Sequence, residues 1–192
     1  MHPIRHFRTI THHRHLVQKY CFQVGLYWRG LTHDLSKYSP TEFWRGAKYY
    51  QGTFSPTQQE RRENGYSLAW MHHKGRNRHH FEYWTDVSPV THQYEPLEMP
   101  TEFFVEMCMD RIAASRTYLG EQYHDGAPLE YLQRAGDNRW MHPVTARKLH
   151  FILSMLRDNG EEETFRFIRE VVLQELPFAE DDMTWSNKRP GS

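Results

Sequence analysis

Apolar side chains recur at helical spacing in nearly every segment of this chain of 192 residues. Between residues 8 and 27, for example, they fall at Leu16, Val17, Tyr20, Cys21 and Val24. The same pattern predicts further helices at 40–51, 56–73, 101–118, 128–132, 144–157 and 161–176, with a candidate break at 64–65. No segment shows a convincing two-residue alternation of a strand. The sequence therefore predicts an all-α protein, a compact helical bundle.

The length fits one domain with a single core. We expect this domain to span residues 1–176, with its core and site within 8–118 and C-terminal helices at 128–176, followed by a polar tail at 177–192. Residues 74–99 are expected to be irregular, and a loop of that length inside a compact domain is often functional.

The chain has 24 Lys and Arg residues against 24 Asp and Glu residues. This balance argues against a partner such as long nucleic acid, whose binders usually carry a clear basic excess. No apolar run approaches the roughly 20 residues that span a bilayer, and the N-terminus lacks the apolar stretch of a secretory signal. We therefore expect no membrane partner and a cytoplasmic location. In a reducing compartment, Cys21 and Cys108 are expected to be buried thiols rather than a disulfide.

Fourteen histidines stand out in the composition. Neutral imidazole is the commonest metal ligand in proteins. In the first predicted helix, His13 shares its face with the apolar Val17 and Val24. It is therefore expected to point inward, either as a hydrogen-bonded core residue or as a ligand, although His12 and His15 remain alternative ligands.

Asp110 interrupts an apolar stripe of the helix predicted at 101–118, formed by Phe103, Met107, Ala114 and Tyr118. An unpaired buried carboxylate costs several kcal/mol, so this one must be paired, hydrogen-bonded or bound to a metal. A buried salt bridge to a nearby arginine and a metal site are both consistent with the pattern.

Two further groups of residues suggest metal chemistry. In the dipeptide His33-Asp34, an imidazole and a carboxylate can reach one divalent cation if the backbone bends there, although such a pair is common by chance. His73, His79, His80 and Glu82 offer four ligands or acid–base groups within ten residues. The alternative for this second group is a solvated polar loop.

The ligand order His13, His33-Asp34, His73, Asp110 resembles that of the HD-domain superfamily of metal-dependent hydrolases, which are all-helical proteins. A more specific resemblance is to an uncharacterised family of bacterial and phage proteins, and it covers roughly the first two thirds of the chain. It is carried by HDLSK at 33–37, Pro40, Glu42, His73, NRHHFEY at 77–83, and Asp110 before Ala113-Ala114.

The superfamily resemblance implies that His13, His33, Asp34 and Asp110 bind a primary metal. It further implies that His73 and His80 hold a second ion, with Asp34 as the bridge. Such mixed ligands suit one or two divalent transition-metal ions: Mn, Fe, Ni, Co or Zn. Whether the 77–82 loop binds the second metal or the substrate is left open.

Other residues are candidates for chemistry around the ion. Glu82 or His79 could act as general acid or base. Lys37 is a candidate for contact with an anionic substrate at the catalytic site, unless it is a surface residue at a helix end. The candidate substrate-binding residues are Arg76, Asn77, Arg78 and His142. Glu42 could orient a ligating imidazole, or it could equally cap its own helix.

The expected function is that of a metal-dependent phosphohydrolase that acts on a small phosphorylated molecule such as a nucleotide. Two alternatives remain at this stage: a di-iron oxygenase of the HD type, and a metal-stabilised binding module without catalysis. The oligomeric state does not follow from the sequence.

Overall fold

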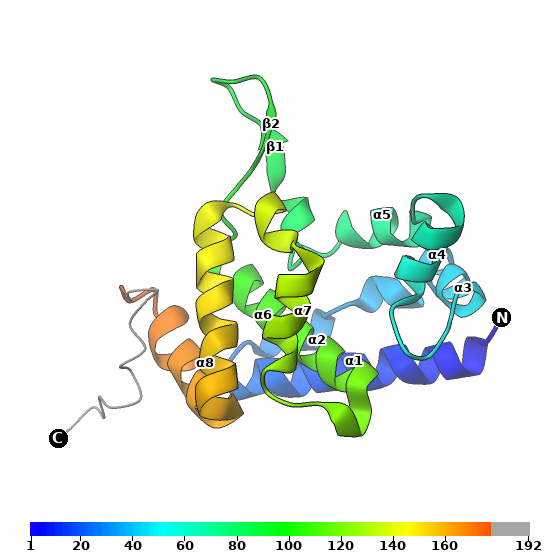
Figure 1. Cartoon of the computed structure of the whole chain (residues 1–192), viewed down its shortest axis with the longest axis horizontal. Coiled ribbons are helices and arrows are strands. Elements are labelled where there is room, and N and C mark those ends of the chain that lie inside the picture. Colours follow the sequence, from blue (N-terminus) through cyan, green and yellow to red (C-terminus); the bar gives the residue numbers. More distant parts are fainter. Residues whose placement is uncertain (178–192) are drawn as a thin grey trace.

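The computed structural model describes residues 1–177, and its architecture is all-α apart from one small hairpin (Figure 1). The α-helices are α1 (Pro3–Gln23), α2 (Tyr27–Thr32), α3 (Pro40–Lys48), α4 (Pro56–Asn64), α5 (Leu68–Lys74), α6 (Thr101–Leu119), α7 (Ala127–Ala135) and α8 (Pro143–Phe167). Short 3₁₀ helices lie at Leu35–Tyr38, Phe81–Tyr83, Gly120–Gln122 and Asp137–Trp140, and a π-helical turn lies at Ile168–Val172. The predicted all-α class is confirmed. Within residues 1–177, none of the helices combines the length and the apolar character needed to cross a membrane.

One continuous hydrophobic core joins the two halves of the described chain. Val17 of α1, Ile112 of α6, Leu132 of α7 and Ile152 of α8 are among its fully buried members. In Figure 1, α1 runs along one long edge of the molecule, and α8 stands across the end that is opposite to the N-terminus. Because the core includes α1 and α6 as well as α8, the C-terminal helices brace the two helices that carry candidate ligands.

The cysteines belong to this core, as the sequence predicts. Cys21 and Cys108 are both buried free thiols. Burial raises the pKa of Cys108 to about 12, so its thiol stays protonated and behaves as a small apolar side chain.

Glycines mark the points where the predicted helices break. The helix expected at 8–27 is two helices, because Gly25 adopts a φ of 92° between α1 and α2. It also begins earlier than predicted, at Pro3, where the missing N–H of proline costs nothing. The candidate break at 64–65 is confirmed by Gly65, which has a φ of 80°. Gly160, with a φ of 80° and a ψ of 178°, likewise separates the two helices expected at 144–157 and 161–176, which otherwise run on as α8.

The segment 74–99 differs from the sequence prediction, because it contains two strands. Strand β1 (Thr85–Val87) pairs antiparallel with β2 (Tyr94–Pro96), with Thr85 opposite Pro96. The hairpin projects from the helical body (Figure 1). Its strands have only three residues each and are largely exposed, so they lack the alternating burial that gives a strand its sequence signature. Of the expected polar tail, residues 178–192 lie outside the described part of the chain.

Close packing of α1 on α3 depends on Gly46. A methyl group at this position would lie 2.2 Å from Nε2 of His6, a buried residue of α1. The His6 ring is also bounded by Phe43 and Tyr50, with centroid distances of 5.5 and 6.0 Å. The absence of a side chain at Gly46 therefore lets α3 approach α1 closely.

We predict that Gly46→Ala destabilises the protein by about 1–3 kcal/mol, because the added methyl overpacks a site with little free space. Chemical denaturation measures this, and the cost should shrink in a His6→Ala background. Gly75→Ala is the control, since the nearest heavy atom to its added methyl is Met71 O at 3.4 Å. A Gly46→Ala protein as stable as its parent contradicts the packing argument.

Candidate metal centre

The backbone bends sharply at His33-Asp34, where α2 gives way to the 3₁₀ helix at 35–38. His33 ends α2 with extended torsions, a φ of −51° and a ψ of 128°. Asp34 is left-handed, with a φ of 55° and a ψ of 24°, which is uncommon for a residue other than glycine. Both side chains are buried, and the imidazole of His33 contacts the carboxylate of Asp34. The bend on which a shared ion depends is therefore present.

A first ligand group combines His13, His33, Asp34 and Asp110, whose candidate ligand atoms all lie within 4.8 Å of one another. Nε2 of His13 is 2.9 Å from Oδ1 of Asp110, and Nε2 of His33 is 3.2 Å from Oδ2 of Asp34. These side chains come from α1, the end of α2 and α6. Residues almost 100 positions apart in the sequence thus converge on one point.

A second ligand group consists of Asp34, His73, His79 and His80, again with ligand atoms within 4.8 Å of one another. Nε2 of His73 and Nε2 of His79 lie 3.3 and 3.4 Å from Oδ1 of Asp34. Asp34 therefore belongs to both groups, with Oδ2 toward the first and Oδ1 toward the second. This is the arrangement of a carboxylate that can bridge two ions.

Two buried glutamates orient three of the imidazoles by contacting their Nδ1 atoms, so that Nε2 faces the centre. Oε1 of Glu106 accepts from Nδ1 of His33 at 2.8 Å and lies 3.1 Å from Nδ1 of His79. Oε2 of Glu42 accepts from Nδ1 of His73 at 2.7 Å. An imidazole that donates through Nδ1 presents the free lone pair of Nε2, as a metal ligand requires. The alternative role for Glu42 is wrong, because the side chain of Ser39 caps α3 and accepts from the Glu42 backbone N–H.

Several atoms that face the centre have close polar neighbours but no well-aligned hydrogen bond. Within residues 1–177, these atoms are Nε2 of His13, His33, His79 and His80, and both carboxylate oxygens of Asp34. Leaving a buried polar atom unsatisfied costs about 1–3 kcal/mol. A divalent cation in each ligand group would satisfy these atoms, and mixed imidazole and carboxylate ligands suit transition metals. These clusters could therefore hold a metal ion.

The electrostatics of the cluster are dominated by carboxylates. Burial disfavours a charged imidazole at His33, yet Asp34, Glu106 and Asp110 outweigh it and raise its pKa to about 10. Burial likewise opposes ionisation of Glu106, but hydrogen bonds from His33 and His79 lower its pKa to about 2. The cluster thus attracts positive charge, either as protons or as a metal ion.

Lys37 is part of the site rather than an isolated surface residue. Its Nζ lies 2.5 Å from Oδ2 of Asp34. Burial opposes its charge, but Asp34 and Asp110 raise its pKa above the ordinary value, so the ammonium persists. Among these side chains Lys37 and Asp110 are the more exposed, at 29% and 15%, whereas His33 and Asp34 are inaccessible to solvent or nearly so. Solvent therefore reaches the cluster from the side of Lys37 and Asp110.

The structure brings together all six residues expected as metal ligands: His13, His33, Asp34, His73, His80 and Asp110. His12 and His15, the alternatives to His13, are exposed. His79 joins the second ligand group, so it is not a free acid–base residue as expected. Glu82 belongs to neither group, and the charges that act on it come from Arg111, Asp137 and Lys74.

The candidate substrate-binding residues lie in different settings. Nδ2 of Asn77 donates to Oγ of Ser36 and to the carbonyl of His73, both at 2.8 Å, so Asn77 fixes the end of α5. Nδ1 of His142 accepts from the backbone of Val144 and caps α8. Arg76 and Arg78 are exposed. Arg76 donates to the carbonyl of His72 at 3.4 Å, and the guanidinium of Arg78 lies 5.7 Å from the ring centroid of Tyr83. Neither of these contacts neutralises the charge, so both arginines remain candidates for binding an anion.

Glu106 is the residue that the sequence analysis missed. It stands one turn before Asp110 on α6, so the two carboxylates share a helical face. In the sequence, the spacing of four residues between Glu106 and Asp110 is the only indication that both carboxylates face the same site. Glu106 stands among apolar residues that are also buried, and the apolar stripe assigned to the face of Asp110 includes position 107 rather than 106.

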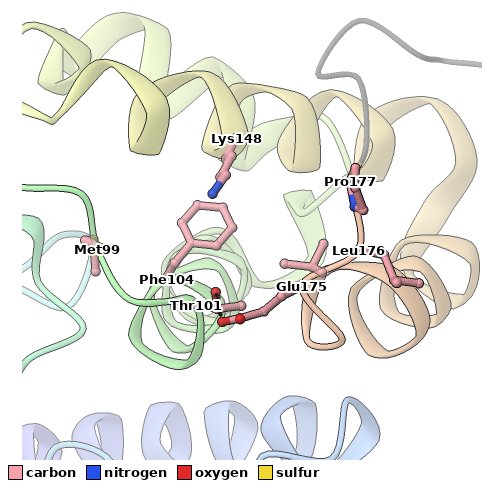
Figure 2. Close-up of a pocket in the computed structure, with 8 residues that line it drawn as sticks. Met99, Thr101, Phe104, Lys148, Glu175, Leu176 and Pro177 are labelled. Atoms are coloured by element: carbon pink, nitrogen blue, oxygen red, sulfur yellow. Dashed lines mark hydrogen bonds between the residues drawn. The ribbon is translucent and has the colours of Figure 1, made fainter.

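A cavity of about 300 Å³ lies elsewhere, between the start of α6, α8 and the turn at 173–177 (Figure 2). Phe104, Lys148 and Leu176 are among its lining residues. Thr101 donates to Glu175 across its floor at 3.0 Å. None of the lining residues belongs to either ligand group, so this cavity is not the metal centre.

The sequence of residues 2–155 matches a family of unknown function, DUF5662. The match covers most of the chain, which therefore belongs to this family. It includes every residue of both ligand groups. No curated protein and no solved structure matches the chain.

We predict that the purified protein carries about one or two divalent ions per chain. Chelation should lower its thermal unfolding midpoint, because an ion held by the folded state alone stabilises that state. Lowering the pH should release the ion, since imidazole must be neutral to ligate. Elemental analysis and calorimetry measure these effects. The Asp34→Asn variant should carry no ion. The control variant Asp86→Asn, which changes a carboxylate on the exposed hairpin, should carry the same amount of metal as the parent protein. An Asp34→Asn protein with full metal content rules out the shared site.

We predict that Glu106→Gln weakens metal binding by about 10- to 100-fold, because it removes the carboxylate that orients His33 and His79. Titration calorimetry on the metal-free protein measures the affinity. The matched control is Glu102→Gln, one turn earlier on α6, where the exposed carboxylate pairs with Arg29 at 2.7 Å. Equal metal affinities for the two variants contradict an orienting role for Glu106.

Proposed function

We propose that this protein is a metal-dependent phosphohydrolase that acts on a small phosphorylated molecule such as a nucleotide. The observation that carries the proposal is the buried Asp34, shared by two ligand groups and touched by the ammonium of Lys37. The order of the ligands along this helical chain supports the resemblance to the HD-domain superfamily, which forms part of the proposal.

Each part of the site has a proposed role in this reaction. One or two divalent ions, when bound, would polarise a phosphoryl oxygen and lower the pKa of a water molecule. The carboxylates of Asp34, Asp110 and Glu106 hold the imidazoles in place and balance the charge of the site. Lys37 stands on the side that solvent reaches, where its ammonium can bind the oxygens of an incoming phosphate.

The loop that carries His79 and His80 supplies further candidates. Arg76 and Arg78 are exposed on this loop and add positive charge near two of the ligands. Glu82 follows His80 by two residues, and burial raises its pKa. A raised pKa favours the protonated carboxyl, which suits a general acid. We therefore retain Glu82 as the proposed proton donor to the leaving group, although it lies outside both ligand groups.

The shared carboxylate also supports a second candidate function. Two histidine-rich groups joined by Asp34 could hold two irons, as a di-iron oxygenase requires. The two functions differ in the metal retained and in the co-substrate consumed. Iron with uptake of O₂ favours the oxygenase, whereas Mn, Ni or Co with release of phosphate favours hydrolysis. A metal-bound protein with neither activity is a binding module.

We predict that the metal-loaded protein releases inorganic phosphate from small phosphate esters, including nucleotides, and that Asp34→Asn abolishes the release. Glu82→Gln should lower kcat by roughly 100-fold or more, because a positioned general acid contributes about that much. Its metal content should stay at the parental level. Unchanged turnover in Glu82→Gln removes this residue from the mechanism, and absence of phosphate release from every ester overturns the proposed function.

A further inference from the structure

The outer face of α1 carries a row of basic side chains. Its exposed members follow one another at intervals of three or four residues, and thus lie on one face: Arg5, Arg8, His12, His15 and Lys19. Residues 1–33 contain five Lys or Arg residues and no Asp or Glu, although the whole chain has 24 of each class. The balanced composition therefore conceals a segment with only positive charge.

The cations of this row are not neutralised within the molecule. Arg14 and Arg29, which belong to the same segment, are engaged: Arg14 donates to the carbonyls of His33 and Leu31, and Arg29 pairs with Glu102. In contrast, the contacts formed by residues 1–177 include no carboxylate partner for the side chains of Arg5, Arg8 and Lys19. These three cations are available to an external anion.

Exposed apolar side chains border the row at both ends. Ile4, at the start of α1, is 68% exposed. At the other end Phe22 packs edge-on against Tyr27, with 5.3 Å between the ring centroids, and Tyr27 is 61% exposed. The outer face thus presents cations in its middle with aliphatic and aromatic groups at its ends.

We propose that this outer face of α1 binds an anionic lipid surface. The helix forms a straight edge of the molecule (Figure 1) and is about 30 Å long. Its exposed row can rest along a plane, with its cations on lipid phosphates and its aromatic groups at the headgroup level. A single nucleic-acid strand is usually held in a basic groove, which an outer helix face does not offer. His13 points from the opposite face of α1 into the metal centre, so binding would leave that centre facing away from the lipid.

Co-sedimentation with phosphatidylcholine vesicles, with and without phosphatidylglycerol, tests this proposal on the full chain and does not depend on the metal centre. We expect binding only to the anionic vesicles, and we expect added salt to reverse it. The double variant Arg8→Glu/Lys19→Glu should bind at least roughly tenfold more weakly. Tyr27→Ala should also weaken binding, because it removes an exposed aromatic ring that packs against Phe22 of α1.

The matched control is Arg61→Glu/Arg134→Glu, which makes the same change of charge at exposed positions of α4 and α7. This variant should keep the parental affinity, and circular dichroism should show that both double variants remain folded. Equal loss of binding in the two double variants reduces the effect to net charge and overturns a dedicated surface. Absence of vesicle binding, or binding of a single-stranded oligonucleotide in its place, overturns the lipid assignment.

Discussion

The burial of Asp34 among imidazoles is the interaction around which the rest of this structure is organised. Its two oxygens face different groups of histidines, and Oδ2 also contacts the ammonium of Lys37. A carboxylate in such surroundings is tolerable only if cations gather around it. Lys37 is one such cation, and the two ligand groups provide room for others. The left-handed backbone at Asp34 is the conformation that turns its carboxylate toward both groups.

Several helices contribute ligands to this centre, and their packing fixes where those ligands lie. Packing of α1 on α6 sets His13 against Asp110, and packing of α3 near α5 sets Glu42 against His73. Glu106 joins the two ligand groups, since it contacts one histidine from each. His33, His73 and His79 are each held at Nδ1 by a carboxylate from a helix, so the direction of their Nε2 atoms depends on helix packing.

Charge is distributed unevenly in this protein, although its formal sum is zero. Four acidic residues, Asp34, Glu42, Glu106 and Asp110, gather around the buried histidines, whereas the first helix has an exposed row that contains no acid. The net charge of the whole chain is the sum over both regions, so it reveals neither the acidic interior site nor the basic outer face. The expectation that the chain does not bind long nucleic acid came from that average, and the expectation of no membrane partner came from the lack of a long apolar run. The proposed lipid surface comes instead from the local distribution of charge.

The sequence by itself determined the helical class and the breaks at Gly65 and Gly160, because helical periodicity and glycine torsions are local properties. It also indicated His13 over its neighbours and marked Asp110 as anomalous, since both judgements need only the face of one helix. Tertiary structure alone decided that His79 joins the ligands, that Glu82 lies outside both ligand groups, and that Asn77 and His142 serve their own helices. It also revealed Glu106, whose role depends on two histidines more than 25 residues away in the sequence. Such roles are set by which side chains meet in space, and the spacing of residues along one helix carries no information about its partners.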